Sequence, residues 1–134
     1  VLADDLPLPL ALIKRDALAH NIAWMQAFAR ERGVQMAPHG KTTMSPQLFQ
    51  RQLDAGAWGI TFANVFQLRV GVERAGVRRA LIANQVHQSV DLDALAALRA
   101  EHHDLRVVFL VDSPAQLALI EAWQATRPTV PGAW

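Results

Sequence analysis

One lysine of this sequence stands where it could do covalent chemistry. Lys41 lies in the run Met-Ala-Pro-His-Gly-Lys-Thr-Thr (36–43), directly after an apolar segment and with no acidic residue within several positions. Partial desolvation in such a place lowers the pKa of a lysine, and the neutral amine can then attack a carbonyl carbon to form a Schiff base. Gly40 would let the backbone approach a ligand closely, and Thr42 and Thr43 offer hydroxyl groups. The alternative interpretation is a solvated surface lysine.

Further polar residues follow the other apolar segments of the chain. Asn84 and Gln85 come after one such segment, Asp112 comes after another, and His39 precedes Lys41 by two positions. Their position makes these four residues candidates for ligand contact. Each also has a structural interpretation, because Asn and Asp side chains commonly cap loops and a single histidine is commonly held by hydrogen bonds.

The elements that must position these residues alternate along the chain. Short apolar runs predict strands at residues 10–15, 34–38, 58–63, 80–83 and 106–111. Between them apolar residues recur at helical spacing, which predicts a helix after each strand. We expect these helices to be capped by Asp16, Ser45, Ser89 or Asp91, and Ser113, and three of them to end at Gly33, Gly56 and Gly76.

This alternation predicts an α/β fold. The strands are apolar runs that begin roughly 25 residues apart, as in βα units of a parallel sheet that is covered on both faces. Two architectures fit five such units, namely a complete doubly wound sheet and the first part of an eight-stranded barrel of about 250 residues. The length favours the first, whereas the linker-like segment 126–134 favours the second. Both place ligands at the carboxyl ends of the strands.

Composition excludes several classes of protein. The chain has 134 residues, 51% of them hydrophobic, with 13 basic and 12 acidic side chains, which argues against a nucleic-acid binder and against a disordered acidic tail. Because there is no cysteine, the segment has no disulfide, no thiolate nucleophile and no cysteine-ligated metal site. It also has no His-x-x-x-His pair or other metal-ligand spacing, so we assign it no metal ligands. The acidic N-terminus is unlike a secretory signal, and the apolar run 6–13 is too short to cross a bilayer. We therefore expect a cytoplasmic protein without nucleic-acid or membrane partners.

The motif around Lys41 resembles that of a known enzyme family. Pro-His-Gly-Lys-Thr (38–42) is similar to the Pro-His-x-Lys-Thr motif of the fold-type III pyridoxal-phosphate enzymes related to D-threonine aldolase and D-serine dehydratase. The resemblance continues in register through Ser45–Pro46, residues 51–60 and residues 83–86. It covers roughly residues 10 to 120, and it points to bacterial proteins of the amino acid deaminase type.

The resemblance implies a fold, a cofactor and a role for Lys41. The fold is the N-terminal (β/α)8 barrel of the alanine racemase type, of which residues 1–134 would be the incomplete first part, about five βα units. The cofactor is pyridoxal 5'-phosphate, and Lys41 corresponds to the lysine that forms the internal aldimine. His39, Thr42, Asn84, Gln85 and Asp112 would lie around it. Departures at Ala37 and Thr43–Met44 bear on the substrate and not on the cofactor.

The activity implied is that of a lyase acting on a D-amino acid. The pyridine ring draws electrons from the substrate Cα, after which either a β-hydroxyl is lost, as in D-serine deamination, or the Cα–Cβ bond is cleaved in a retro-aldol reaction. A racemase on the same scaffold would also use Lys41, and a non-enzymatic α/β binding module is the remaining alternative.

The rest of the site would lie outside this chain. In the resembling enzymes the phosphate-binding loops are on later strands, and a C-terminal β-domain completes the pocket and helps to bind a divalent metal. The absence of an initiating methionine also suggests a fragment. We expect the fragment alone to be inactive and poorly stable, because its sheet edges would be unpaired, and we expect the intact protein to be a homodimer.

Overall fold

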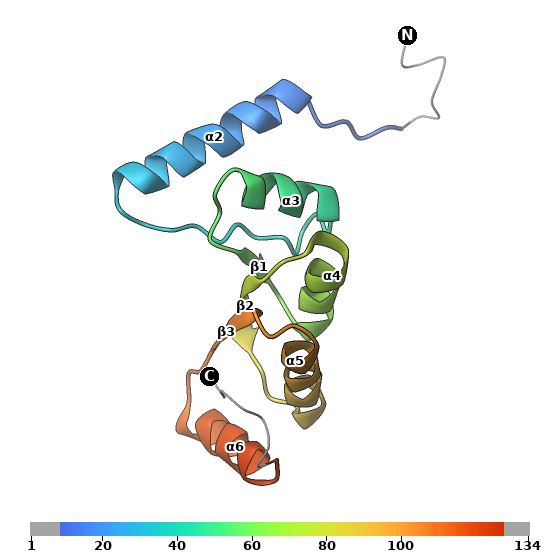
Figure 1. Ribbon diagram of the computed structural model, residues 1–134, viewed down its shortest axis with the longest axis vertical. Helices are drawn as coiled ribbons and strands as arrows, with labels where there is room; N and C mark the ends of the chain where they lie inside the picture. The colour runs from blue at the N-terminus through green and yellow to red at the C-terminus, as the bar shows by residue number, and fades with distance from the viewer. Residues whose placement is uncertain (1–8, 128–134) are drawn as a thin grey trace. The chain divides into compact units, whose positions relative to one another are not determined.

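A computed structural model describes residues 9–127 of the chain. The acidic N-terminus and most of the segment expected to be a linker lie outside these residues. The chain divides into two units, residues 1–34 and 35–134, which we describe separately. The helices and strands are α2 (Arg15–Glu31) in the first unit, and α3 (Pro46–Asp54), β1 (Ile60–Phe62), α4 (Val65–Ala75), β2 (Arg79–Gln85), α5 (Ser89–Glu101), β3 (Arg106–Leu110) and α6 (Pro114–Ala125) in the second (Figure 1).

Among the described residues of the first unit, the one helix is α2. Its N-cap residue is Lys14, so the cap predicted at Asp16 is wrong, and the Asp16 carboxylate instead lies in the first turn, where it favours the positive end of the helix dipole. Trp24 is 55% exposed. Its ring stacks on Phe28 at 5.3 Å, and the guanidinium of Arg32 lies 3.6 Å from the Phe28 ring centroid.

The strand predicted at residues 10–15 is absent from the described part of the chain. Residues 9–14 have no strand conformation assigned, and Arg15 already begins α2. A strand is stabilised by hydrogen bonds to a neighbouring strand. Residues 9–14 have no such ladder partner among the described residues, and an apolar run without a partner cannot hold a strand conformation.

The second unit contains a parallel sheet with the order β1-β2-β3. Ile60, Thr61 and Phe62 pair with Ala80, Leu81 and Ile82, and β2 pairs with β3 from Arg79 opposite Arg106 onward. The predicted α/β class with a parallel sheet is therefore confirmed. At Gly59 the two strands approach so closely that a Cβ would lie 2.2 Å from the Arg79 carbonyl oxygen, so only glycine fits there.

The segment predicted as a strand at 34–38 lies beside β1, although it is too irregular to count as a strand. His39 forms a parallel bridge with Thr61: the Thr61 amide donates to the Pro38 carbonyl at 2.9 Å, and the Gly40 amide donates to the Thr61 carbonyl at 2.8 Å. Pro38 has no N–H to donate, which limits regular pairing at this position. The predicted position is confirmed, whereas the regular strand is not.

The order of these segments bears on the two architectures left open by the sequence. Residues 34–40, β1, β2 and β3 follow one another in space as they do along the chain. A doubly wound sheet requires a point at which the strand order reverses. No reversal occurs among these four neighbouring segments, so the observed order argues against the doubly wound alternative.

One face of the sheet is covered by helices. Phe62 and Ile82 are 0% and 1% exposed, and they belong to a single core to which α3, α4, α5 and α6 contribute. The helices α4 and α5 lie side by side along the strands in Figure 1. Gly71 in α4 allows the Phe62 ring to come close, since a Cβ at Gly71 would lie 2.3 Å from the ring edge.

The other face of the sheet is open. Thr61, Leu81 and Val108 stand side by side in the register, and their exposure rises from buried at Thr61 to 52% at Val108. The strands are apolar on both faces, as expected, but only one face is covered within the described residues.

The predicted helix ends are confirmed, whereas of the other predicted caps one is confirmed and two are not. Ser113 accepts a hydrogen bond from the Gln116 amide and caps α6 as predicted. Ser45 is the N-cap residue of α3, but its hydroxyl donates to the Gln47 side chain instead of capping the backbone. The N-cap residue of α5 is Gln88, so neither Ser89 nor Asp91 has the predicted cap position. The expected glycine stops at Gly33, Gly56 and Gly76 are confirmed by positive φ angles of 63°, 100° and 63°.

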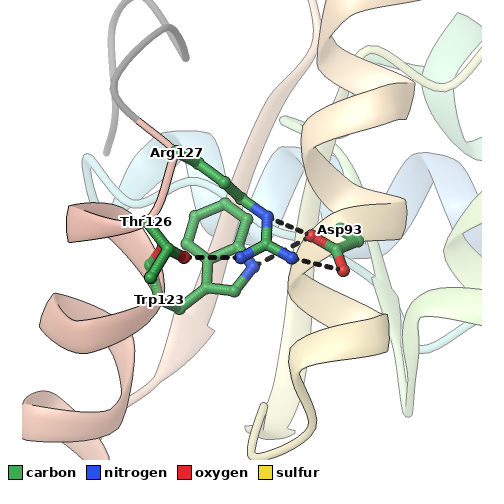
Figure 2. A network of polar contacts seen from close by, with 4 residues as sticks. All are labelled: Asp93, Trp123, Thr126 and Arg127. Carbon is green, nitrogen blue, oxygen red and sulfur yellow. Dashed lines mark hydrogen bonds and ion pairs between the residues drawn. The ribbon is translucent and has the colours of Figure 1, made fainter.

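A polar cluster links the last two helices (Figure 2). The Asp93 carboxylate on α5 accepts from Trp123 Nε1 at 3.0 Å and is paired with Arg127 Nε at 2.6 Å. Arg127 Nη1 also donates to Thr126 Oγ1 at 2.8 Å. Trp123 is 5% exposed and belongs to the hydrophobic core. The cluster holds the end of α6 against α5.

In the part of the chain that the structure describes, no helix is long and apolar enough to cross a membrane.

Candidate functional site

Lys41 lies on a turn that follows the bridge to β1. The turn begins at Gly40, which is buried and whose amide is bonded to the Thr61 carbonyl. A Cβ on Gly40 would lie 2.7 Å from the Phe49 ring and 2.8 Å from Ile60 Cγ2. The missing side chain therefore lets the backbone pack against the core. The close approach of a ligand expected at Gly40 stays a prediction.

Met44 closes the same turn. Its amide donates to the Gly40 carbonyl at 2.9 Å, and Thr43 Oγ1 donates to the same oxygen at 3.5 Å. Its φ angle is 41°, in the left-handed region that residues with a Cβ rarely occupy. The Met44 side chain packs against the hydrophobic core. The turn is thus held at both ends by buried groups.

The side chains of the turn point outward into solvent. Lys41, His39 and Thr42 are all exposed. Among the described residues, no carboxylate pairs with Lys41 and no hydrogen bond occupies its Nζ. The partial burial predicted for Lys41 is therefore wrong for this stretch of chain, because no described segment covers the turn. What remains is an unpaired primary amine on a rigid backbone.

His39 also borders a hollow on the open face of the sheet. This open cavity of about 460 Å³ is lined by Gln35, Met36, Ala37, His39, Trp58, Thr61, Leu81 and Val108. Thr61 closes one wall, because its hydroxyl donates to the Ala37 carbonyl at 2.6 Å. The hollow places His39 on the same side of the sheet as the open apolar face.

A second polar group lies at the ends of β2 and β3. The Gln85 side-chain amide donates to the Asp112 carboxylate, so the structure brings two of the predicted residues together. The Asp112 backbone amide is bonded to Gln116 Oε1 at 3.2 Å, and Gln116 Nε2 donates to the Leu110 carbonyl at 3.0 Å. Gln116 is 2% exposed, so this bonding satisfies a buried amide.

Asn84 joins β2 to β1. Its Nδ2 donates to the Ala63 carbonyl at 2.7 Å, and the Ala63 amide is bonded in turn to Gln67 Oε1 at 2.9 Å. Together with Gln116, these side chains form a set that we call the amide rim (Gln67, Asn84 and Gln116). The rim links the carboxyl ends of neighbouring strands, and the predicted ligand-contact role of Asn84 stays a prediction.

The predicted site residues thus fall into two groups. His39, Lys41 and Thr42 share the turn, whereas Asn84, Gln85 and Asp112 lie at the ends of β2 and β3. All six lie at or just after the carboxyl ends of parallel segments, as expected, and Asn84 and Gln85 are the last two residues of β2. No hydrogen bond or ion pair joins the two groups within the described residues. The described residues also contain no group of three or more metal-ligating side chains.

Sequence reasoning missed Gln67 and Gln116. Both stand three residues after a helix cap, Gln67 after Asn64 and Gln116 after Ser113. This spacing matches the capping box, in which the third helical residue bonds back to the backbone before the helix. The signal was present in the sequence, and it would have located both amides.

Comparisons with known proteins point in one direction. A scan against protein-family models gives no match, and a search of curated proteins gives none either. Among solved structures, D-threonine aldolase from Filomicrobium marinum matches with a TM-score of 0.82 and 28% identity over 92% of this chain. D-threo-3-hydroxyaspartate dehydratase from Delftia sp. HT23 matches with a TM-score of 0.81 and 31% identity, also over 92% of this chain.

These matches cover only part of the solved proteins. The chain spans 32% of the aldolase and 31% of the dehydratase, or about a third of either length. One further structure of the dehydratase is a C353A mutant in the metal-free form, with a TM-score of 0.80. The resemblance to the D-threonine aldolase and D-serine dehydratase-like branch that the sequence suggested is confirmed by these neighbours.

Proposed function

We propose that this chain is the lysine-bearing first part of a pyridoxal-phosphate-dependent lyase that acts on a D-amino acid. The observation that carries the proposal is Lys41, an unpaired amine on a turn fixed at Gly40 and Met44, in a fold shared with a D-threonine aldolase and a D-threo-3-hydroxyaspartate dehydratase. Both neighbours are named for substrates with a hydroxyl on Cβ. A D-amino acid with a β-hydroxyl is therefore the proposed substrate class.

The proposed architecture is a (β/α)8 barrel of the alanine racemase type. Two observations support it: the unreversed order of residues 34–40, β1, β2 and β3, and the open apolar face at Leu81 and Val108. In a barrel such a face points inward and is filled by side chains of the other strands. Residues 1–134 would be an incomplete domain, and the C-terminal β-domain would lie outside this chain.

The residues present fit the cofactor. Lys41 Nζ is accessible and carries no competing ion pair in the described residues, which a lysine that bonds to an aldehyde carbon requires. His39 and Thr42 flank it as hydrogen-bonding groups. Asp112 is held by Gln85, which leaves one carboxylate oxygen to accept a hydrogen bond from a ligand. When bound, pyridoxal phosphate supplies an electron sink for the substrate Cα.

Lys41 has two tasks in this proposal. Its Nζ holds the cofactor, and when that nitrogen is free it can take a proton from the substrate or return one. Proton transfer of this kind is efficient when the lysine is covered, so the segments that close over Lys41 must come from outside the described residues. A divalent metal, which the metal-free form of the dehydratase mutant implies for that enzyme, would likewise be held outside them, since they contain no group of three or more metal-ligating side chains.

Cofactor trapping on the intact protein tests the proposal. The protein is incubated with pyridoxal phosphate, reduced with borohydride and digested, and the labelled peptide is identified by mass spectrometry. This chain contains two lysines, Lys14 and Lys41, so Lys14 is a built-in control. We expect the label on Lys41 and its loss in Lys41→Arg. A label on Lys14 alone, or none, would overturn the proposal.

Product analysis then separates the reactions. Release of ammonia with a 2-oxo acid indicates dehydration, glycine with an aldehyde indicates retro-aldol cleavage, and inverted substrate indicates a racemase. The homodimer and the cytoplasmic location of the intact protein belong to the same proposal. Light scattering on the purified protein and cell fractionation test them.

A further inference from the structure

We propose that Met44 is a positioning residue for Lys41. Its left-handed backbone and its core-packed side chain together hold the turn from which Lys41 projects. This inference rests on the proposed function, because it gives Met44 a part in the reaction of Lys41 with the cofactor aldehyde.

The strain at Met44 needs a cause. A φ angle of 41° brings the Cβ of an L-residue close to its own backbone, and such a residue keeps this conformation only when its surroundings fix it. Two contacts fix it here. The Met44 amide is bonded to the Gly40 carbonyl at 2.9 Å, and the side chain packs on the hydrophobic core.

Ser45 and Pro46, which follow Met44, prevent the backbone strain at Met44 from being relieved on the C-terminal side of the turn. Ser45 is in the extended conformation, with φ −104° and ψ 107°, and Pro46 occupies the first turn of α3. A residue before proline is disfavoured in the helical region, so Ser45 cannot absorb the strain by joining the helix. The direction change between the turn and α3 is therefore concentrated at Met44.

The opposite end of the turn is equally fixed. Gly40 is bonded to Thr61 at 2.8 Å and packs against Phe49 and Ile60 with no space for a side chain. Residues 41–43 thus lie between two anchored residues, Gly40 and Met44, and the side chains of residues 41–43 are exposed. Among the described residues no hydrogen bond or ion pair engages the Lys41 side chain, so its backbone is placed while its Nζ stays free to react.

A simple packing role predicts a different result. If Met44 served only the core, its loss would lower stability and leave the turn geometry unchanged. Leu53 in α3 offers a matched control, because it is also half-buried and packs on the same core. Leu53→Ala removes a similar apolar contact without touching the turn.

The experiment uses the intact protein and compares four variants: Met44→Ala, Met44→Gly, Met44→Leu and Leu53→Ala. The first readout is the rate at which Lys41 becomes labelled when pyridoxal phosphate is trapped with borohydride, divided by the rate for Lys14. We expect Met44→Ala and Met44→Gly to slow labelling of Lys41 by about three- to tenfold, because a loosened turn loses preorganisation. We expect Met44→Leu, which keeps a side chain that can pack on the core, to label Lys41 at the wild-type rate. We expect the same rate in Leu53→Ala.

The second readout is independent of the cofactor. Amide hydrogen exchange of the peptide spanning residues 41–44 reports the bond from Met44 to Gly40. We expect exchange of this peptide to rise about tenfold in Met44→Gly, and to stay at the wild-type rate in Leu53→Ala.

The outcomes keep the two proposals apart. No label on Lys41 of the wild-type protein overturns the proposed function, and with it the positioning role. A label on wild-type Lys41 whose rate is the same in Met44→Ala and Met44→Gly overturns the positioning role alone. Equal slowing by Leu53→Ala has the same consequence, because the effect would then follow from general core loss.

Discussion

The two faces of the sheet are built from the same strands but differ in what covers them. On the helix side, Phe62 and Ile82 are 0% and 1% exposed. On the opposite side, the neighbours in the same register are Thr61, Leu81 and Val108, and the last of these is 52% exposed. The strands carry mainly apolar residues on both sides, which is typical of a sheet that is buried on both faces. Among the described residues, helices cover only one of these faces.

Because of this difference, the helix side stabilises the described residues, whereas the open side leaves apolar residues available for further contacts. The helix side holds a closed core with an edge-to-face pair between Phe49 and Phe62 at 5.5 Å. The open side carries the hollow beside His39, and in the proposed barrel this side would face inward. Substitutions on the closed side should destabilise the chain as it stands, whereas those on the open side should act only when the rest of the protein is present.

The largest effect is expected from Phe62→Ala. Removal of a fully buried ring leaves a cavity among α3, α4 and β1, and such changes cost about 3–5 kcal/mol. Urea denaturation followed by circular dichroism should show this loss in both the 134-residue chain and the intact protein. Phe66→Ala on the outside of α4 is the control, since Phe66 is 74% exposed and should change stability little. Equal losses for the two variants would contradict a closed helix side.

A smaller loss is expected from Gly71→Ala. The added methyl group would meet the Phe62 ring at 2.3 Å, and overpacking of this kind costs about 1–3 kcal/mol. The gain in helix propensity, about 1 kcal/mol, offsets part of that cost. The double variant with Phe62→Ala should recover stability relative to the sum of the single changes, because the clash disappears with the ring. Additive losses would mean that the ring and the glycine do not constrain each other.

Thr61→Val tests the boundary between the two faces. Thr61 Oγ1 donates to the Ala37 carbonyl at 2.6 Å, and valine keeps the shape but not the bond. We expect a loss of about 1 kcal/mol and faster amide exchange in residues 36–40. Thr42→Val serves as the matched control, because Thr42 is exposed and has no bond of this kind. A stability of Thr61→Val equal to that of the control would show that residues 34–40 are not held by this bond.

The smallest effect in this chain is expected from Val108→Ala. A half-exposed side chain on the open face contributes little, so the loss should stay within about 0.5 kcal/mol for the 134-residue chain. In the intact protein the same change should cost roughly 1–3 kcal/mol, because the proposed barrel interior would bury Val108. The same small loss in both would break the comparison and the barrel proposal together.

Much of the fold could be predicted from the sequence because local signals were strong. The apolar spacing of Val65, Leu68 and Val72 and the stop at Gly76 predicted α4 as it is observed. The parallel strands at 80–83 and 106–111 were recognised as uninterrupted apolar runs. The order of the strands was left open, since it depends on pairing between distant segments and leaves no local trace.

The site was predicted less completely. Lys41, Gln85 and Asp112 were named as candidates because α/β folds place their chemistry at strand ends, and their roles stay predictions. The exposure of Lys41 could not be found, since it depends on segments that would cover the turn. The packing role of Gly40 could not be found either, because only the fold brings Phe49 and Ile60 against it.

The amide rim has a consequence for how the molecule responds to its medium. Gln67, Asn84 and Gln116 carry no charge, and each is bonded to backbone groups. Added electrolyte screens ionic attractions but leaves such neutral contacts almost untouched, and amides do not titrate between acid and alkaline conditions. The distances between the strand ends should therefore stay constant from dilute buffer to high salt. Only the ionisable groups that lie near the rim should respond to pH and ionic strength.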